Sequence, residues 1–353
     1  MKQTKVLLVG DDSYDMYVKA FYQSFRELGY KNVRLFATNR YMQTQSRIKK
    51  TILKAENRGA LGIRVSYINR ELVHCVETMK PELVFLYSAR LIYADTIKEI
   101  KRQGAVVFVY NNDDPFAVYY PKWFWRHFKG SLKYADVGFV YREKNIEEYR
   151  KCGCARTEML RAYYMKNRNY YIPDVEMKVP AVVFLGHNER DERQDYIRML
   201  LRAHIEVGVT RRTWEDFEPD NPYLIKLENS HEKYNEMINA TEIAIVFLSK
   251  INNDTYTRRC FEIPATKTLM VAPYTEDIAS MFKEDEEAVF FRNGEEFVKK
   301  IKYYLRNKNE RQKIAEAGYE RLMRDGYESG DRVRFIMNIY EDVNGKIRKA
   351  DII

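Results

Sequence analysis

The chain has 353 residues, of which 45% are hydrophobic, 31% charged and 14% aromatic. This composition is too apolar for a disordered chain, and at roughly 100–200 residues per domain the length predicts two globular domains. The net charge of +9 favours anionic partners, which include nucleic acids, membrane surfaces and phosphorylated small molecules.

The longest apolar runs have the length of strands. Those at 181–186 and 243–248 fall well short of the roughly 20 residues that a membrane-spanning helix needs. The N-terminus enters the run VLLVG at once and lacks the features of a signal peptide, so we expect a cytoplasmic protein.

The four cysteines are too few for a disulfide framework, and neither they nor the five histidines have metal-ligand spacing. The sequence therefore predicts no metal site.

The first half of the sequence alternates short apolar runs with helical patterns. Strands are predicted at 5–9, 33–37, 83–87, 105–110 and 137–141, and helices at 17–28, 41–58, 71–79, 94–102 and 146–151. Apolar strands without strict alternation, separated by helices, indicate a parallel sheet with right-handed crossovers. Residues 1–165 are therefore predicted to form a doubly wound, Rossmann-like α/β domain.

The pattern restarts after a polar stretch with two prolines at 166–180, which we interpret as a linker or hinge. Strands are predicted at 181–185, 206–209, 223–227, 243–248, 269–272 and 288–291, and helices at 196–201, 234–239, 278–282, 295–307 and 309–324. Residues 166–330 thus form a second α/β domain, and a last helix within 331–353 is expected to pack back on the first. Two such domains would face each other across a cleft lined by strand-end loops, where these sheets bind ligands.

The densest group of polar side chains follows the predicted strand at 243–248. It is the stretch Asn-Asn-Asp-Thr-Tyr-Thr-Arg-Arg-Cys-Phe-Glu-Ile-Pro-Ala at 252–265, and a helix starting within it would offer its N-terminal amides to a diphosphate. Arg258 and Arg259 would add guanidinium groups, whose planar forks can hold two phosphate oxygens. Glu262, one turn later, either accepts hydrogen bonds from a ribose or forms a buried ion pair with Arg258.

The stretch from Tyr234 to Ala272 resembles the donor-binding half of glycosyltransferases with the GT-B fold. It combines a helix, an Ala-Thr-Glu strand, the motif Arg-Arg-Cys-Phe-Glu-Ile-Pro-Ala and a Leu-Met-Val-Ala strand, and the closing helices at 303–321 also match. The resemblance is strongest to the CgeB-like type with a "glycosyl transferases group 1" C-terminal domain. It implies transfer of a hexose from a nucleotide-diphosphate sugar to a hydroxyl acceptor, without a metal ion or a cofactor, in polysaccharide, glycolipid or glycoprotein synthesis.

The resemblance also assigns roles to single residues of the second domain. Glu262 takes the place of the family's ribose-binding glutamate. Asp254, next to Asn253, takes the place of the first acid of a Glu-x7-Glu pair, which faces the donor sugar in relatives that usually retain the anomeric configuration. Lys267 stands where the family usually has glycine, and it would put an extra cation near the site.

The loop at 186–190, Gly-His-Asn-Glu-Arg, resembles the family's loop after the first strand of the donor domain. Glycine lets backbone amides approach an anion, and arginine neutralises the departing diphosphate. The donor-binding residues expected here are Gly186, Asn188, Arg190 and Arg193. Trp214 either shields the nucleobase or belongs to the core.

In the first domain, Asn-Asn-Asp-Asp-Pro at 111–115 follows a buried strand. Asp113 and Asp114 are the predicted catalytic residues, which would orient the acceptor hydroxyl or take its proton, unless they only form a turn. CgeB-like proteins tend to carry Asp-Asp-Pro here, whereas the histidine of many retaining relatives is absent. Asp11 and Asp12 follow the first strand. Their loop either touches the acceptor or only caps the first helix, through Asp12 or Ser13.

A basic aromatic segment, Tyr-Tyr-Pro-Lys-Trp-Phe-Trp-Arg-His-Phe-Lys, occupies 119–129. It would pack on the domain, line an acceptor groove or contact the inner face of a membrane, with rings at the headgroups and cations on anionic lipid. The expected partners are a nucleotide sugar and a glycan, lipid-linked or protein acceptor. Peripheral membrane contact stays open, and no nucleic acid is expected.

Two other functions stay open. The run Val-Gly-Asp-Asp-Ser at 9–13 resembles the acidic pocket of a receiver domain, and the basic charge would suit nucleic acid. However, Tyr-Ser-Ala at 87–89 offers no acceptor aspartate, and no helix shows a cluster of base-reading residues. A GT-B relative that epimerises or hydrolyses nucleotide sugars would share the donor residues without needing an acceptor.

Overall fold

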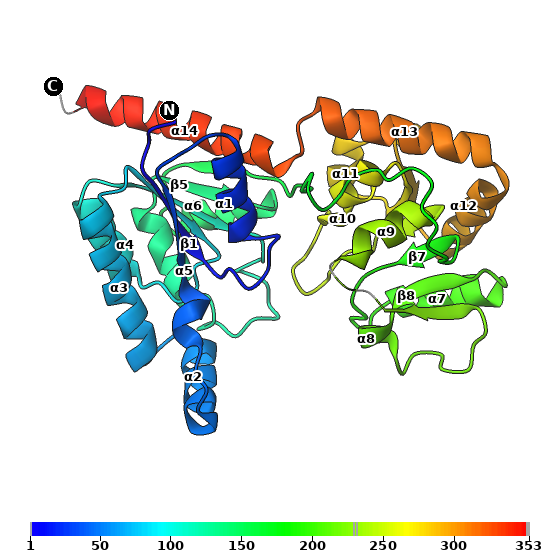
Figure 1. Cartoon of the computed structure of the whole chain (residues 1–353), viewed down its shortest axis with the longest axis horizontal. Helices are drawn as coiled ribbons and strands as arrows, with labels where there is room; N and C mark the ends of the chain where they lie inside the picture. The colour runs from blue at the N-terminus through cyan, green and yellow to red at the C-terminus, as the bar shows by residue number, and fades with distance from the viewer. Residues whose placement is uncertain (1, 229, 231, 351–353) are drawn as a thin grey trace. The chain divides into compact units, whose positions relative to one another are not determined.

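The computed structural model describes residues 2–228, 230 and 232–350, with side chains up to residue 345. The chain forms two compact units, shown in Figure 1. The N-terminal unit comprises residues 1–161 and the C-terminal segment that begins at Ser329, and the C-terminal unit comprises Ala162–Glu328. The corresponding limits predicted from the sequence are 165 and 330.

The N-terminal unit contains a six-stranded parallel sheet in the order β2-β1-β3-β4-β5-β6. The strands are β1 (Val6–Gly10), β2 (Val33–Ala37), β3 (Leu83–Tyr87), β4 (Val106–Asn111), β5 (Val137–Val140) and β6 (Thr157–Met159). The helices are α1 (Val18–Glu27), α2 (Arg47–Gly59), α3 (Ile63–Met79), α4 (Ala94–Arg102), α5 (Arg126–Ser131), α6 (Lys144–Lys151) and α14 (Ser329–Ala350), with 3-10 turns at Thr38–Met42 and Leu132–Tyr134.

Both faces of this sheet are covered, which is why β1, β3 and β4 are buried at every position. On one face, α3, α4 and α5 contribute to a single apolar cluster. On the other face, Phe21 of α1 meets Phe85 with ring centroids 5.4 Å apart, and Phe335 of α14 meets Phe139 at 6.2 Å. The C-terminal helix α14 therefore packs on the sheet of the N-terminal unit.

The C-terminal unit contains a second six-stranded parallel sheet, in the order β12-β11-β10-β7-β8-β9. The strands are β7 (Val182–Phe184), β8 (Val207–Thr210), β9 (Leu224–Leu227), β10 (Ile243–Ile245), β11 (Leu269–Pro273) and β12 (Val289–Phe291). The helices are α7 (Arg193–Arg202), α8 (Arg211–Trp214), α9 (Lys233–Ala240), α10 (Arg259–Glu262), α11 (Glu276–Met281), α12 (Gly294–Arg306) and α13 (Lys308–Arg324), with a 3-10 turn at Pro264–Thr266. The predicted fold class, two doubly wound parallel sheets, is confirmed.

Several segments differ from the sequence-based prediction. The predicted helix at 41–58 is a 3-10 turn followed by α2, because Ser46 caps the helix there, with its hydroxyl 3.4 Å from the backbone N–H of Lys49. The helix predicted at 71–79 begins at Ile63. The short strand β6 was missed because its three residues are only partly buried and form no apolar run. No helix of the described residues is long and apolar enough to cross a membrane.

Candidate functional site

The carboxyl ends of β7 and β10 mark the point where the strand order of the C-terminal unit reverses. From β7 the chain continues through α7 to β8 on one side, and from β10 it continues through α10 to β11 on the other. The loops that leave these two adjacent strands therefore run in opposite directions along the sheet. Doubly wound sheets bind their ligands at such a switch point. All the predicted donor-binding residues follow one of these two strands, within 185–193 or 246–262.

Gly186 and Arg259 meet across the switch point. The Nε–H of Arg259 donates to the carbonyl of Leu185 at 3.0 Å, just beyond β7. A Cβ on Gly186 would lie 3.0 Å from Nη2 of Arg259 and 2.5 Å from Cζ of Phe184, so glycine leaves the room that the guanidinium occupies. Within the part of the chain that the structure describes, the terminal N–H groups of Arg259 have no hydrogen-bond partner. They are available to an anion.

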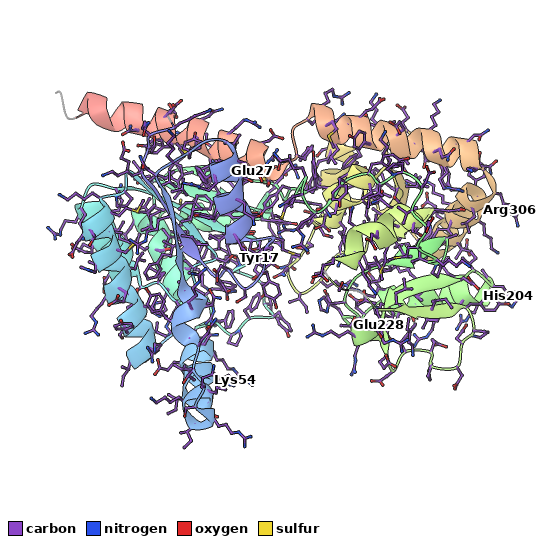
Figure 2. The ribbon with its side chains drawn as sticks, in the orientation of Figure 1. Tyr17, Glu27, Lys54, His204, Glu228 and Arg306 are labelled. Atoms are coloured by element: carbon purple, nitrogen blue, oxygen red, sulfur yellow. The ribbon has the colours of Figure 1, made fainter. Side chains whose placement is uncertain are left out.

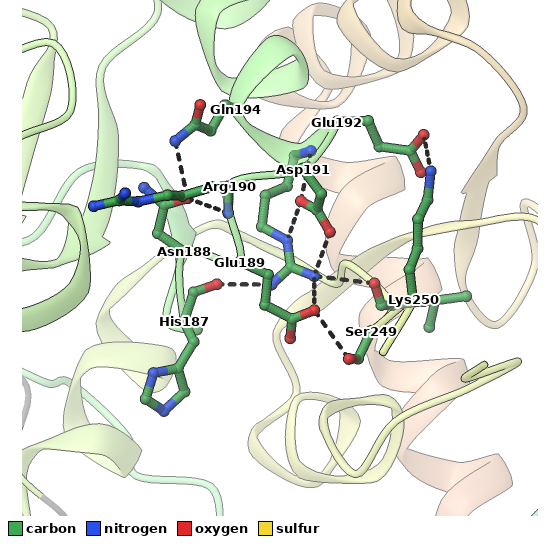
Figure 3. Close-up of polar contacts among 12 residues, drawn as sticks. His187, Asn188, Glu189, Arg190, Asp191, Glu192, Gln194, Ser249 and Lys250 are labelled. Carbon is green, nitrogen blue, oxygen red and sulfur yellow. Dashed lines mark hydrogen bonds and ion pairs between the residues drawn. The ribbon is translucent and has the colours of Figure 1, made fainter. Parts of the chain in front are cut away.

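Polar contacts fix the loop after β7. Trp214 of α8 is fully buried and donates its indole N–H to the Gly186 carbonyl at 2.9 Å. The amide oxygen of Asn188 accepts from the backbone N–H of Arg190 at 3.0 Å and from Gln194 at 3.1 Å, as Figure 3 shows. Arg190 has a left-handed φ of 53° and an exposed side chain. The loop thus presents the Arg190 side chain to solvent.

Arg193 is a buried residue that holds the same loop together. It is only 3% exposed, and it donates to the carbonyls of His187 at 2.7 Å and Leu248 at 3.1 Å. It also pairs with the carboxylates of Glu189 at 3.1 Å and Asp191 at 2.7 Å. A guanidinium with four partners must give some of them up to bind a phosphate, so this arrangement disfavours the predicted contact of Arg193 with the diphosphate.

Two further contacts tie the loop after β7 to the loop after β10. Ser249 donates to the carboxylate of Glu189 at 2.9 Å, and Lys250 pairs with Glu192 at 2.7 Å (Figure 3). Together with the Arg193 contacts, they join the two sides of the switch point.

Glu262 ends α10 and is partly exposed. Its Oε2 accepts a hydrogen bond from the phenol of Tyr234 on α9 at 3.1 Å. Desolvation, and then the Glu262 carboxylate, raise the pKa of Tyr234 well above its ordinary value, so the phenol stays a hydrogen-bond donor.

Among the described residues Glu262 forms no ion pair, and Arg258 lies instead over the ring of Tyr163 at 4.8 Å. The alternative of a buried ion pair between Arg258 and Glu262 is therefore wrong.

Asn253 and Asp254 line a separate pocket of 460 Å³, to which Arg193 and Ser249 also contribute. Asn253 has a left-handed φ of 52°, as expected for a turn former, and the backbone N–H of Asp254 donates to the Ser249 carbonyl at 2.9 Å. Glu262 is not one of the described residues that line this pocket. The structure thus places the two acids of the predicted pair in different surroundings.

Lys267 does not add a cation at the switch point. It takes the left-handed conformation that glycine favours, with a φ of 56°, directly after the 3-10 turn. Its ammonium group pairs with Glu316 of α13 at 2.7 Å and lies over the rings of Tyr171 at 5.1 Å and Tyr319 at 4.7 Å. The expectation of an extra cation near the site is therefore wrong.

In the N-terminal unit, Asp114 is fully buried after β4. Its carboxylate accepts from the side-chain amide of Asn145 at 2.9 Å and pairs with Lys144 at 2.8 Å, both at the start of α6. Asp113 is partly exposed and lies near Tyr120, whose pKa is raised by desolvation and then by this carboxylate. Asp114 therefore anchors the turn to α6, and Asp113 is the better placed of the two to meet a substrate.

Asp11 and Asp12 follow β1. Asp12 accepts two hydrogen bonds from Arg40, at 3.0 and 2.5 Å, and Asp11 accepts from the backbone N–H of Ser13 at 2.8 Å. The first helix begins only at Val18, with Tyr17 as its N-cap and no side-chain cap bond, so capping by Asp12 or Ser13 is wrong. Contact of these acids with an acceptor stays a prediction.

Sequence reasoning missed the roles of Tyr234 and Trp214. Tyr234 precedes Glu262 by 28 residues, so no local spacing relates the phenol to the carboxylate. Trp214 is a core residue, one of the two alternatives considered, yet its N–H also fixes the Gly186 carbonyl. The sequence could indicate only that a phenol or an indole, once buried, needs a hydrogen-bond partner, and not which partner it takes. The described residues contain no group of three or more His, Cys, Asp or Glu that could hold a metal ion.

A segment that contains most of this site matches a known family model. Residues 190–338 match the family model described as glycosyl transferase-like. No curated protein matches the chain.

Solved structures match nearly the whole chain at low identity. Sucrose-phosphate synthase from Thermosynechococcus elongatus is 12% identical with a TM-score of 0.73, over 98% of this chain and 100% of its own. HepE from Anabaena, in complex with UDP, is 10% identical with a TM-score of 0.65, over 96% and 100%. A Listeria monocytogenes protein described as a UDP-N-acetylglucosamine 2-epimerase is 10% identical with a TM-score of 0.58, over 95% of each chain.

These likenesses confirm the expected GT-B fold, but they do not confirm the CgeB-like subtype. Residues 190–338 thus match a glycosyl transferase-like family model, and the protein is an enzyme of the glycosyltransferase type with the GT-B fold.

Proposed function

We propose that the protein transfers a sugar from a nucleotide-diphosphate sugar to a hydroxyl acceptor, and that the donor binds at the switch point of the C-terminal unit. The observation that carries this proposal is the placement of Arg259 and Glu262 on one short helix, α10, beside the loop of Gly186. Arg259 has N–H groups to offer a diphosphate, and Glu262 has a carboxylate oxygen to offer a ribose diol.

The rate enhancement would come from positioning and from charge. As the glycosidic bond breaks, negative charge grows on the departing diphosphate, and Arg259 and Arg190 would stabilise it. Tyr234 would hold the Glu262 carboxylate in a fixed orientation toward the ribose. Retention of configuration at the sugar, with Asp254 facing it, is part of the proposal, as are the absence of a metal ion and of a cofactor.

The acceptor would bind to the N-terminal unit, where Asp113 is the residue proposed to orient or deprotonate its hydroxyl. Glycans, lipid-linked sugars and proteins all offer such hydroxyls, so polysaccharide, glycolipid and glycoprotein synthesis all fit. We also propose a cytoplasmic location with peripheral contact at the inner membrane face. Its support is the exposure of two aromatic side chains of the 119–129 segment, Tyr119 and Trp123.

The proposal is tested by thermal unfolding of the full chain with UDP, GDP, ADP and dTDP. A ligand at 100 times its Kd stabilises the native state by about 2.7 kcal/mol, which gives a measurable rise in Tm. No rise with any of the four would overturn the donor site. Incubation with the stabilising nucleotide's sugars and analysis of the products then separates transfer from the alternatives, because an epimerase or a hydrolase turns over without an acceptor.

A further inference from the structure

Helix α2 of the N-terminal unit shows most of its surface to solvent. Of its 13 residues only Leu53 is buried. The helix extends away from the sheet in Figure 1, and Lys54 marks its position in Figure 2. The basic residues of this helix lie on its exposed surface, and the structure shows what lies beside them.

The exposed surface of α2 carries an apolar row and a basic row, with Thr51 between them. At about 100° per residue, positions 48, 52, 55 and 59 fall in one row along the helix. That row consists of Ile48, Ile52, Ala55 and Gly59. The basic row consists of Arg47, Lys50, Lys54 and Arg58. The helix has five basic residues and one acidic residue, and the Glu56 carboxylate is already bonded to the backbone N–H of Arg64 at 2.7 Å.

The apolar row continues beyond the helix. Leu61 and Ile63 follow at the corner between α2 and α3, and Ile63 is 87% exposed. Arg126 joins this corner to the basic aromatic segment, because it donates to the carbonyl of Gly59 at 2.6 Å and to that of Trp123 at 3.2 Å. The segment therefore lies beside the corner.

A second arginine makes the same connection. Arg90 donates to the carbonyl of Asn57 on α2 at 2.5 Å and lies 4.5 Å from the centre of the Phe124 ring. The neighbouring Val118 is 99% exposed. Trp125 and Phe128, in contrast, are buried, so the segment is divided between packing and exposure.

The exposed apolar side chains form what we call the apolar ridge: Ile48, Ile52, Leu61, Ile63, Val118 and Trp123. Within the described part of the chain, every large, exposed Ile, Leu or Val side chain belongs to this ridge. Scattered apolar residues on a protein surface need no explanation, but their concentration on one helix and two adjoining loops does.

We propose that the apolar ridge and the basic row of α2 bind an anionic phospholipid membrane, with α2 lying in the plane of the interface. Charge complementarity favours this occupant, because lysines and arginines flank the ridge and attract anionic headgroups. The aliphatic side chains would enter the boundary between headgroups and acyl chains, and Trp123 would sit at headgroup level. The proposal rests on the peripheral contact put forward above, and it names the surface and the lipid class.

Vesicle flotation with the full chain tests the proposal without nucleotide or acceptor. The chain should float with vesicles of phosphatidylglycerol and phosphatidylcholine at low salt, and at least tenfold less with phosphatidylcholine alone or in 0.5 M NaCl. The variants K50E/K54E and I48S/I52S should each lower binding to anionic vesicles at least tenfold. All four side chains are exposed, so both variants should keep the native Tm.

A matched control is K308E/K313E in α13, which changes the net charge equally at exposed positions and should keep vesicle binding. All variants should keep the rise in Tm with the donor nucleotide, so a failure of the membrane surface is distinct from a failure of the donor site. No binding of the native chain to anionic vesicles would overturn the proposal. So would a dimer in sedimentation that I48S/I52S converts to a monomer, because the ridge would then pair two copies of the chain.

Discussion

The phenol of Tyr234 donates a hydrogen bond to Oε2 of Glu262 at 3.1 Å, and this bond joins α9 to α10 beside the switch point. Because the raised pKa of Tyr234 keeps the phenol protonated, the carboxylate always has a donor on one oxygen. Its other oxygen is left for a ligand. The pair is thus suited to hold a ribose in one orientation relative to Arg259 on the same helix.

Replacement of Glu262 by alanine should weaken the binding of nucleoside diphosphates by roughly 10- to 100-fold. A hydrogen bond to a charged group is worth about 1.5–3 kcal/mol, and the ribose would lose such bonds. Tyr234→Phe should weaken binding less, because it only frees the carboxylate to turn. Isothermal titration calorimetry measures both effects. Tyr303→Phe is the matched control, since that phenol also donates to a carboxylate, Glu310, on the surface. An unchanged Kd in Glu262→Ala would remove the ribose role.

Gly186→Ala should impair donor binding about as much as Arg259→Ala. The added methyl group would lie 3.0 Å from Nη2 of Arg259 and closer still to the Phe184 ring, so the guanidinium or the ring must move. Because both substitutions act through the same group, the double variant should bind no worse than either single one. Additive losses would show that Gly186 acts independently of Arg259.

Gly345→Ala is the control for this substitution. Gly345 lies within α14 and a Cβ there would meet no heavy atom within 4 Å. Alanine in a helix is more favourable than glycine by about 1 kcal/mol, so this variant should raise the Tm slightly and leave nucleotide binding unchanged. The two glycine variants should therefore differ in nucleotide binding, which only Gly186→Ala weakens.

The strands of both sheets could be predicted from the sequence because parallel strands buried on both faces are continuous apolar runs. The strand β6, whose residues are only partly buried, gave no such signal. Arg259 and Glu262 could be singled out because they are polar residues just after a buried strand. Their hydrogen-bond partners could not be predicted, because Tyr234 and Leu185 are distant in sequence. Only the fold brings them next to Glu262 and Arg259.

Arg193 shows that residue type and position can also suggest a ligand contact that the packing disfavours. Its type and its place after a glycine loop favoured a phosphate ligand, yet its four partners within the C-terminal unit make it part of the scaffold. Residue type and spacing indicate which groups could bind a ligand. Only the packing decides which of them are already engaged.

Asp113 and Asp114 should differ in what their replacement changes. Asp114→Ala removes a fully buried carboxylate and leaves Lys144 and Asn145 with only Glu148 as an acidic partner, so we expect a loss of about 3 kcal/mol in the free energy of unfolding. Asp113→Asn should keep the Tm and the donor Kd while turnover falls at least tenfold. Denaturant unfolding, calorimetry and a product assay measure the three quantities. Full turnover in Asp113→Asn would show that this residue only shapes the turn.

Cys260 should report on the opening of α10, the helix that carries Arg259 and Glu262. Burial raises the pKa of this thiol from 9 to about 12, so at pH 8 only about one molecule in 10,000 carries the thiolate that reacts with iodoacetamide. Cys152 is only partly buried, so it should be alkylated first, and Cys260 should react only in denaturant. Mass spectrometry of peptides from the native and the unfolded chain measures both rates.

The raised pKa also sets the direction of a pH effect on stability. Between pH 9 and 12 the unfolded chain loses the Cys260 proton while the native chain keeps it, so this residue makes the free energy of unfolding fall as the pH rises through that window. Cys260→Ser should flatten this part of the pH dependence. A nucleoside diphosphate bound by Arg259 and Glu262 would stabilise α10 and slow the alkylation of Cys260 further. Rapid labelling of Cys260 in the native chain at pH 8, unaffected by nucleotide, would show that α10 opens freely and does not form the donor site.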